Sequence, residues 1–240
     1  MPCGAGAHYR FVYARYARHT EVDVPFATGA LLGLVLIAQP APSKADAVFW
    51  QWFEGNARRL AAAQRPSEQL LDEVQRELQK AEPGLAFEIG YEGPRAPRML
   101  VVSADGARER FAAVKRLVGA APRKVPGWQV VAFRQRKPGL EVAYQGVRLH
   151  PRDVWFSSER VGGAVNVLVH VRESGSHPLP AVQGAVLLLL DSTLGEYDVE
   201  TRVEGIEIRP LPVDPRAAWL RPLSELPAVV DAVKALGPER

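Results

Sequence analysis

The amino-acid sequence predicts an α+β fold: two tandem β-β-α-β units with a mainly antiparallel sheet, preceded by two helices. Apolar residues recur at helical spacing in the first part of the body. The order strand, strand, helix, strand then occurs twice, at about 85–137 and 153–211, and such units place helices on one face of a sheet. The composition, 47% hydrophobic and 24% charged, is typical of a globular protein with a core. We expect one domain over residues 45–240, with pseudo-repeated halves.

Residues 1–44 are predicted to be an N-terminal extension that acts as a signal peptide or a tether. The uncharged run at 26–38 is short for a bilayer span but has the length of a signal-peptide core. Against export, Glu21 and Asp23 stand where a signal peptide carries positive charge. The alternatives are a cytoplasmic protein, which is slightly favoured, and a periplasmic protein if residues 26–38 are a signal peptide. Membrane contact is expected only through this segment, if it is retained.

Charge and cysteine content narrow the classes of partner. Cys3 is the single cysteine, which excludes an intramolecular disulfide and a Cys-based zinc site. The formal net charge is only +3. Basic residues gather at 122–124 and 134–137, which lie at opposite ends of one predicted strand and so about 30 Å apart. We therefore do not expect nucleic acid as a partner, although Trp128 and Phe133 could stack on bases as in single-strand binders.

Two helices are predicted to open the body, at 43–63 and 67–84. Ser43 is the expected N-cap of the first, and Asp46 completes a capping-box-like pair. Trp50 lies off the apolar stripe of this helix, so we expect it to be partly exposed. The two stripes consist of Phe49, Trp52, Phe53, Asn56 and Leu60, and of Leu70, Leu71, Val74 and Leu78.

The first β-β-α-β unit begins where the periodicity changes from helical to alternating. Leu85, Phe87 and Ile89 alternate with small or polar residues, as in a half-buried strand. The expected elements are strands at 85–92 and 98–106, a helix at 107–122 and a strand at 127–134.

The second unit repeats this order after an extra hairpin or linker at 139–151. A turn at Gly162-Gly163 predicts a hairpin between the strands at 153–160 and 164–171. A helix is expected at 181–194, and Gly195 suits its end.

The last predicted elements are a strand at 198–211 and a helix at 226–236. Within the strand the parity of the apolar residues changes at Gly205, which predicts a β-bulge there.

Four carboxylates, Asp191, Glu196, Asp198 and Glu200, follow the leucine-rich part of the predicted helix. We predict that they form the solvated edge of a turn, because polar residues in turns need no special role. The alternative is a metal-dependent hydrolase that uses Asp191, Glu196 and Asp198, since paired carboxylates serve as metal ligands or as an acid–base pair. No catalytic motif accompanies them, so the question of an enzyme stays open.

Other motifs that would indicate a cofactor are not found. His150, His170 and His177 do not have the spacing of a zinc site. Neither a dinucleotide-binding GxGxxG nor a phosphate-binding GxxxxGK[ST] occurs. No cofactor is therefore predicted.

Seven short motifs are spread over about residues 45–227: FWQWF (49–53), LAFEIG (85–90), LVVSADG (100–106), GWQVVAFR (127–134), DVWF (153–156), LGEYDVET (194–201) and PLSELP (222–227). As a set they resemble a family of uncharacterised bacterial proteins that is grouped as a domain of unknown function. Its members are sometimes joined to a domain like the ribonuclease E inhibitors. The resemblance implies one continuous domain and a bacterial origin, and it brings no catalytic residues to this sequence.

The sequence therefore favours a non-enzymatic binding or regulatory domain. A protein partner is the expected kind of ligand, bound on a sheet face or between the two β-β-α-β units. Aromatic side chains outside the predicted stripes are the candidate contacts, namely Trp50, Trp128 and Trp155.

Overall fold

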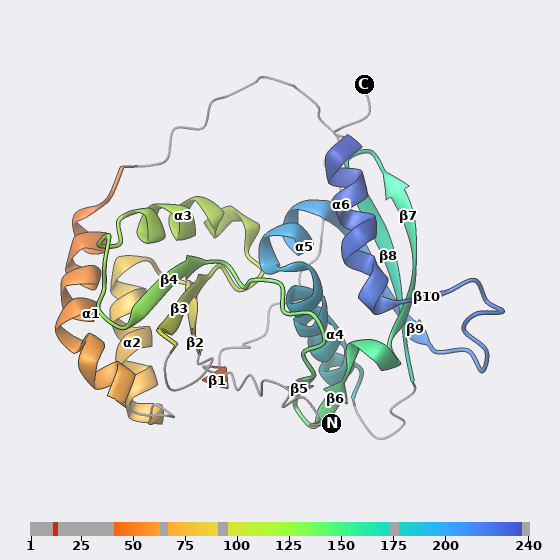
Figure 1. Ribbon diagram of the computed structural model, residues 1–240, viewed down its shortest axis with the longest axis horizontal. Helices are drawn as coiled ribbons and strands as arrows, with labels where there is room; N and C mark the ends of the chain where they lie inside the picture. The colour runs from red at the N-terminus through yellow and green to blue at the C-terminus, as the bar shows by residue number, and fades with distance from the viewer. Residues whose placement is uncertain (1–11, 14–40, 63–66, 91–95, 173–177, 237–240) are drawn as a thin grey trace, which may run out of the picture. The chain divides into compact units, whose positions relative to one another are not determined.

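The chain, described by a computed structural model, divides into two compact units, residues 1–132 and 133–240, here called unit 1 and unit 2 (Figure 1). The structure describes residues 12–13, 41–62, 67–90, 96–172 and 178–236. The predicted signal or tether segment at 26–38 lies outside the described residues.

The two predicted helices of unit 1 form where their first turns are capped. Ser43 Oγ accepts the Asp46 N–H at 3.0 Å, and Asp46 Oδ2 accepts the Ser43 N–H at 2.7 Å, which is the reciprocal pair of a capping box. Ser67 Oγ caps the second helix by accepting the Leu70 N–H at 3.3 Å. The helices are α1 (Lys44–Ala62) and α2 (Glu68–Ala81).

The sheet of unit 1 has the strand order β1-β2-β3-β4. Strands β2 and β3 pair antiparallel, whereas β3 and β4 pair parallel, so a crossover through α3 connects them. The elements are β1 (Val12–Tyr13), β2 (Ala86–Gly90), β3 (Arg98–Ser103), the 3₁₀ turn η1 (Arg108–Arg110), α3 (Phe111–Gly119) and β4 (Trp128–Ala132).

Aromatic side chains from α1 form the centre of the unit 1 core. Phe53 is fully buried, and its ring packs edge-on against those of Trp50 and Trp128, with centroids 5.7 and 5.1 Å away. Edge-to-face contacts of this kind add to the burial of the rings themselves. The predicted apolar face of α2 is buried as well, at Leu70, Leu71, Val74 and Leu78.

The sheet of unit 2 has the order β10-β7-β8-β9. The predicted hairpin is present: Val161 pairs with Ala164 across Gly162-Gly163. Strands β8 and β9 pair parallel and are connected through α4 and α5. The elements are β5 (Val142–Tyr144), β6 (Val147–Leu149), η2 (Pro151–Asp153), β7 (Trp155–Val161), β8 (Ala164–Val171), α4 (Leu179–Leu194), α5 (Glu196–Arg202), β9 (Val203–Pro210), β10 (Arg221–Pro222), η3 (Leu223–Glu225) and α6 (Leu226–Leu236).

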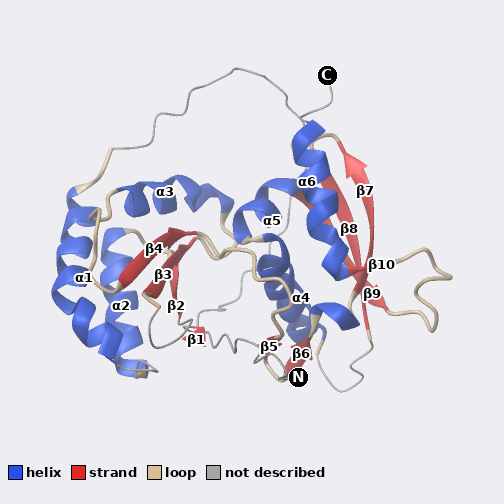
Figure 2. Cartoon of the chain, viewed as in Figure 1, coloured by secondary structure: helices blue, strands red, loops and turns tan. Residues whose placement is uncertain are grey.

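Both units therefore contain the predicted β-β-α-β order, with an antiparallel pair followed by a parallel pair (Figure 2). Each sheet also has a fourth strand, antiparallel to the first strand of the β-β-α-β segment. In unit 1 this strand, β1, precedes the β-β-α-β segment in the chain, and in unit 2 the strand, β10, follows it. The α+β fold with mainly antiparallel pairing is confirmed.

The sheet of unit 2 has one face in the core. Val165, Val167 and Val169 of β8 are buried and belong to a cluster with residues of α4 and α6, such as Leu189 and Val230. The residues between these valines are half-exposed, since successive side chains of a strand point to opposite faces. Figure 1 shows α4, α5 and α6 on the same side of this sheet.

The prediction of a strand at 198–211 is wrong for its first part. Residues 196–202 form the helix α5, and the strand β9 begins only at Val203. Gly195, with a φ of +82°, ends α4, and its carbonyl accepts the Val199 N–H at 3.0 Å in the first turn of a new helix. The predicted bulge is confirmed, because Val165 pairs with Val203 but Asn166 pairs with Gly205.

The predicted hairpin at 139–151 is present as β5 and β6, and it packs on α4. Tyr144 of the hairpin lies against Gly184 of the helix, where an added Cβ would overlap the tyrosine ring. A glycine in the middle of a helix costs about 1 kcal/mol relative to alanine, so the close approach of the ring explains its presence.

We expect Gly184→Ala to lower the free energy of unfolding by about 1–3 kcal/mol, because overpacking exceeds the gain in helix propensity. Gly55→Ala in α1 is the matched control, since nothing lies within 4 Å of a Cβ at that position. The control is expected to stabilise the protein by up to about 1 kcal/mol. Urea unfolding of both variants checks the prediction, which is contradicted if they change stability in the same direction.

Candidate functional site

Of the four carboxylates at the α4–α5 junction, Glu196 and Asp198 are buried, and Asp191 and Glu200 are half-buried. Glu196 is fully buried and Asp198 is 9% exposed. The prediction of a solvated edge is therefore wrong for Glu196 and Asp198. It failed because 198–202 was taken as a strand, whereas helix α5 turns these side chains toward the segment that begins unit 2.

Two arginines in the segment that begins unit 2 form ion pairs with aspartates of the α4–α5 junction. Arg134 Nη1 lies 3.3 Å from Asp191 Oδ2, and Arg136 Nη2 lies 2.6 Å from Asp198 Oδ2. Glu196 instead binds backbone: its Oε2 accepts the Arg134 N–H at 3.1 Å, and its own N–H donates to the Arg134 carbonyl at 3.0 Å. These residues, with Asp231 of α6, are called the unit 2 ion-pair network below.

Arg136 connects three elements of this network. Its Nε donates to the Leu194 carbonyl at the end of α4 at 2.7 Å, and its Nη1 and Nη2 each lie 2.8 Å from an oxygen of Asp231. Hydrogen bonds to Asp231 and then to Asp198 outweigh burial and raise the pKa of Arg136 above its ordinary value. The guanidinium therefore stays charged and holds the α4–α5 junction to α6.

This arrangement does not favour the hydrolase alternative. A metal bound by Asp191, Glu196 and Asp198 would have to displace guanidinium groups and a backbone N–H from their oxygens. In the part of the chain that the structure describes, no three His, Cys, Asp or Glu side chains are grouped so that they could hold a metal ion. Chemically, the junction is an ion-paired support for the fold of unit 2.

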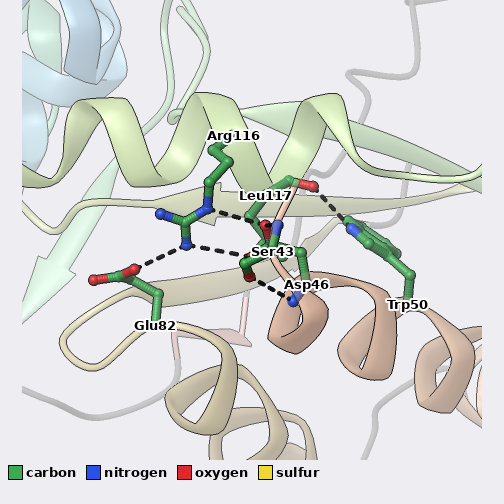
Figure 3. Close-up of polar contacts among 6 residues, drawn as sticks. All are labelled: Ser43, Asp46, Trp50, Glu82, Arg116 and Leu117. Carbon is green, nitrogen blue, oxygen red and sulfur yellow. Dashed lines mark hydrogen bonds and ion pairs between the residues drawn. The ribbon is translucent and has the colours of Figure 1, made fainter. Parts of the chain in front are cut away.

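Unit 1 contains a second ion-pair network, shown in Figure 3. Arg116 of α3 donates from Nε to Asp46 Oδ2 at 2.9 Å and from Nη2 to Glu82 Oε2 at 2.9 Å. Asp46 is fully buried, so its charge is compensated by Arg116 and by the N–H groups of the capping box. The side chain that caps α1 thus also joins α1 to α3.

The pKa of the Asp46 carboxyl reflects this balance. Burial alone would raise it, but hydrogen bonds from Arg116 and Ser43 outweigh burial and lower the pKa below its ordinary value of 3.8. The carboxylate is therefore charged at neutral pH, and its contribution to stability depends on that charge.

The expectation of exposure is wrong for Trp50 and Trp128. Trp50 is 2% and Trp128 is 7% exposed, and each indole N–H donates to a helix carbonyl, of Leu117 and Ala57 respectively. An indole can be buried in this way once its N–H has an acceptor. Trp155 of β7 is half-exposed and lies opposite His170 on the sheet face away from the core.

The most exposed aromatic side chain among the described residues is Trp219, which the sequence reasoning missed. It is 91% exposed, and Val213 nearby in the same connection is fully exposed. Both belong to residues 211–220 between β9 and β10, here called the Trp219 loop. Figure 1 shows this loop extending from the unit 2 sheet on the side away from α4 and α6.

The Trp219 loop is ordered by its own hydrogen bonds. Asp214 Oδ1 accepts the N–H groups of Arg216 and Ala217 at 3.0 and 3.1 Å, as an N-cap does. The Trp219 N–H then donates to the Arg216 carbonyl and the Leu220 N–H to the Pro215 carbonyl, at 3.0 and 2.9 Å. This pair of bonds is the Schellman motif, which ends a helical turn with a left-handed residue.

Trp219 occupies the position of this motif where glycine is usual. Its φ is +57°, a conformation that costs a residue with a Cβ about 1–2 kcal/mol. Because its side chain is almost wholly exposed, packing does not offset this strain. Asp214-Pro215 is a sequence signal for the start of a helical turn, but no pattern in the sequence shows which side of the turn Trp219 faces.

Comparison with protein-family models, with curated proteins and with solved structures gave no match. Among the described helices, none is both long enough and apolar enough to cross a membrane. The chemistry of the described side chains is therefore the basis for a functional conclusion.

Proposed function

We propose that the chain is a non-enzymatic binding module and that unit 2 contacts a protein partner through the Trp219 loop. The observation that carries the proposal is Trp219 itself: a strained residue with an almost fully exposed indole. Strained backbone conformations are concentrated at functional sites, and tryptophan, tyrosine and arginine are the side chains most enriched at the centres of protein interfaces.

The loop has two further properties of a binding surface. Its internal hydrogen bonds fix the backbone before binding, which reduces the entropy that association must overcome. Val213 and Arg216 lie beside Trp219 in the chain and are also exposed, so an apolar contact with a charged border is available. The acids that a hydrolase would need are engaged with arginines of the same unit.

We expect Trp219→Gly to weaken binding strongly without loss of stability. Glycine suits the left-handed position, so the free energy of unfolding should be unchanged or higher by up to about 1 kcal/mol. Loss of a central tryptophan should weaken binding by about 30-fold or more.

Photo-crosslinking tests this expectation. A photoreactive amino acid at Val213 in the full chain, expressed in its native host, should form discrete adducts that Trp219→Gly removes. The adduct partner, once identified by mass spectrometry and purified, should show the same dependence in a direct affinity measurement. Val48→Ala in α1 is the matched control, because it shortens an apolar side chain that is 59% exposed in unit 1. Adducts that persist in Trp219→Gly, or a fall in stability of that variant, would contradict the proposal.

A further inference from the structure

Unit 2 has a sheet face that its helices do not cover. The buried valines of β8 point to the helices, so the alternate residues of β7 and β8 form the opposite face, here called the open face. Its cross-strand pairs are Trp155 with His170, Ser157 with Leu168, Glu159 with Asn166, and Val161 with Ala164. Each of these side chains is half-exposed or exposed.

Apolar and polar side chains both occur on the open face, and the apolar ones lie on β7 and β8. Val161 is 43% exposed, and Leu168 does not belong to the core cluster that contains its neighbours Val167 and Val169. With Trp155 and Ala164, these residues provide apolar contacts on both central strands. On the neighbouring strand β9 the same face continues with the exposed ion pair of Glu207 and Arg209, so the apolar contacts are bordered by charge.

The Trp219 loop and the open face are complementary in chemistry. The loop has two exposed apolar side chains, Trp219 and Val213, and the open face has apolar side chains that are only half-covered. Arg216 of the loop and Glu159 of the open face are both exposed and carry opposite charges. The apolar and the basic side chains of the loop in one copy of the chain therefore match apolar and acidic side chains on the open face of another copy.

We infer that unit 2 forms a symmetric dimer in which the Trp219 loop of each copy covers the open face of the other. The inference rests on the proposed function and names a second copy of the chain as the partner. The loop extends to the side of the sheet away from the helices, which is the side of the open face (Figure 1). A two-fold arrangement makes the loop contact twice and leaves neither loop nor face free, whereas a head-to-tail contact would lead to rings or filaments.

Sedimentation equilibrium of the full chain, at about 1 to 200 μM, tests the inference directly. The wild type should be a dimer in the upper part of this range. Trp219→Gly and Leu168→Glu should each weaken the dimer by about 30-fold or more, since each removes or charges a central apolar contact. Val48→Ala in unit 1 should leave the dissociation constant unchanged.

Exchange of the charges at Arg216 and Glu159 is a stricter test. Arg216→Glu should weaken the dimer by about 10-fold, because two acidic side chains then face each other. The double variant with Arg216→Glu and Glu159→Arg should restore the wild-type dissociation constant, since the pair is reversed in both contacts.

The outcomes separate this inference from the proposed function. A wild type that stays monomeric at the highest concentration, or a dimer that Trp219→Gly leaves intact, would overturn the inference. If the chain is monomeric while the Val213 adduct depends on Trp219, another protein is the partner and the proposed function stands. If adducts are also independent of Trp219, both proposals fail.

Discussion

Arg116→Met will lower the free energy of unfolding by about 3–5 kcal/mol at pH 7, because it leaves the fully buried Asp46 carboxylate without its guanidinium. Met retains most of the apolar stem of Arg116, so the loss is mainly one of charge compensation. Urea unfolding followed by tryptophan fluorescence measures it, since Trp50 and Trp128 both lie in the unit 1 core.

The pH dependence distinguishes charge from packing. In the wild type the folded-state pKa of Asp46 is below 3.8, so its stabilisation is present at neutral pH and is lost as the pH falls through that lower pKa. Without Arg116 the burial of Asp46 would raise its pKa. The loss of stability in Arg116→Met then becomes smaller as Asp46 takes up a proton and its buried charge disappears. The stability difference between wild type and variant should therefore shrink from pH 7 to about pH 3. A constant difference over this range would show that Arg116 acts through packing alone.

Lys80→Met serves as the control for this experiment. Lys80 pairs with Glu77 in α2, and its side chain is 62% exposed. Removal of such a surface pair should change stability by less than about 0.5 kcal/mol at any pH.

Arg136→Met should destabilise unit 2 by about 2–3 kcal/mol, because the buried Asp198 loses its partner and the Leu194 carbonyl loses a donor. The contact between Arg136 and Asp231 is more exposed, so it contributes less to this loss of stability. Amide hydrogen exchange should show lower protection in α6 and around the α4–α5 junction, with no change in α1 and α2.

Arg209→Met is the control for the second experiment. Arg209 pairs with Glu207 on β9, and both side chains are more than half exposed. We expect Arg209→Met to change the free energy of unfolding by less than about 0.5 kcal/mol. Equal loss of protection in both units after Arg136→Met would contradict a local role for the network.

Local patterns in the sequence were sufficient to predict most of the fold. The capping pair of Ser43 and Asp46, the glycine turn of the β7–β8 hairpin and the parity change at Gly205 each report a short-range geometric requirement. Helix α5 was missed because alternating β-branched residues resemble a strand, while hydrogen bonding after Gly195 and burial of Glu196 favour a helix.

The candidate site was harder to predict because it depends on contacts between distant residues. Arg134 and Asp191, for example, are 57 positions apart in the chain. The burial of Trp50 required the Leu117 carbonyl of another helix as an acceptor, and a helical pattern alone does not contain that information. The exposure of Trp219 likewise depends on the direction in which the turn leaves the sheet.

The mutual hydrogen bonds of Arg134 and Glu196 determine where the protein can be divided. A recombinant fragment that starts in the turn at Pro138-Gly139 would lack both arginines, and its Glu196 carboxylate would be left without the Arg134 N–H. Expression of the second half should therefore succeed only when it begins at Phe133 or earlier, and limited proteolysis that cuts between residues 133 and 138 should release an unfolded rather than a compact product.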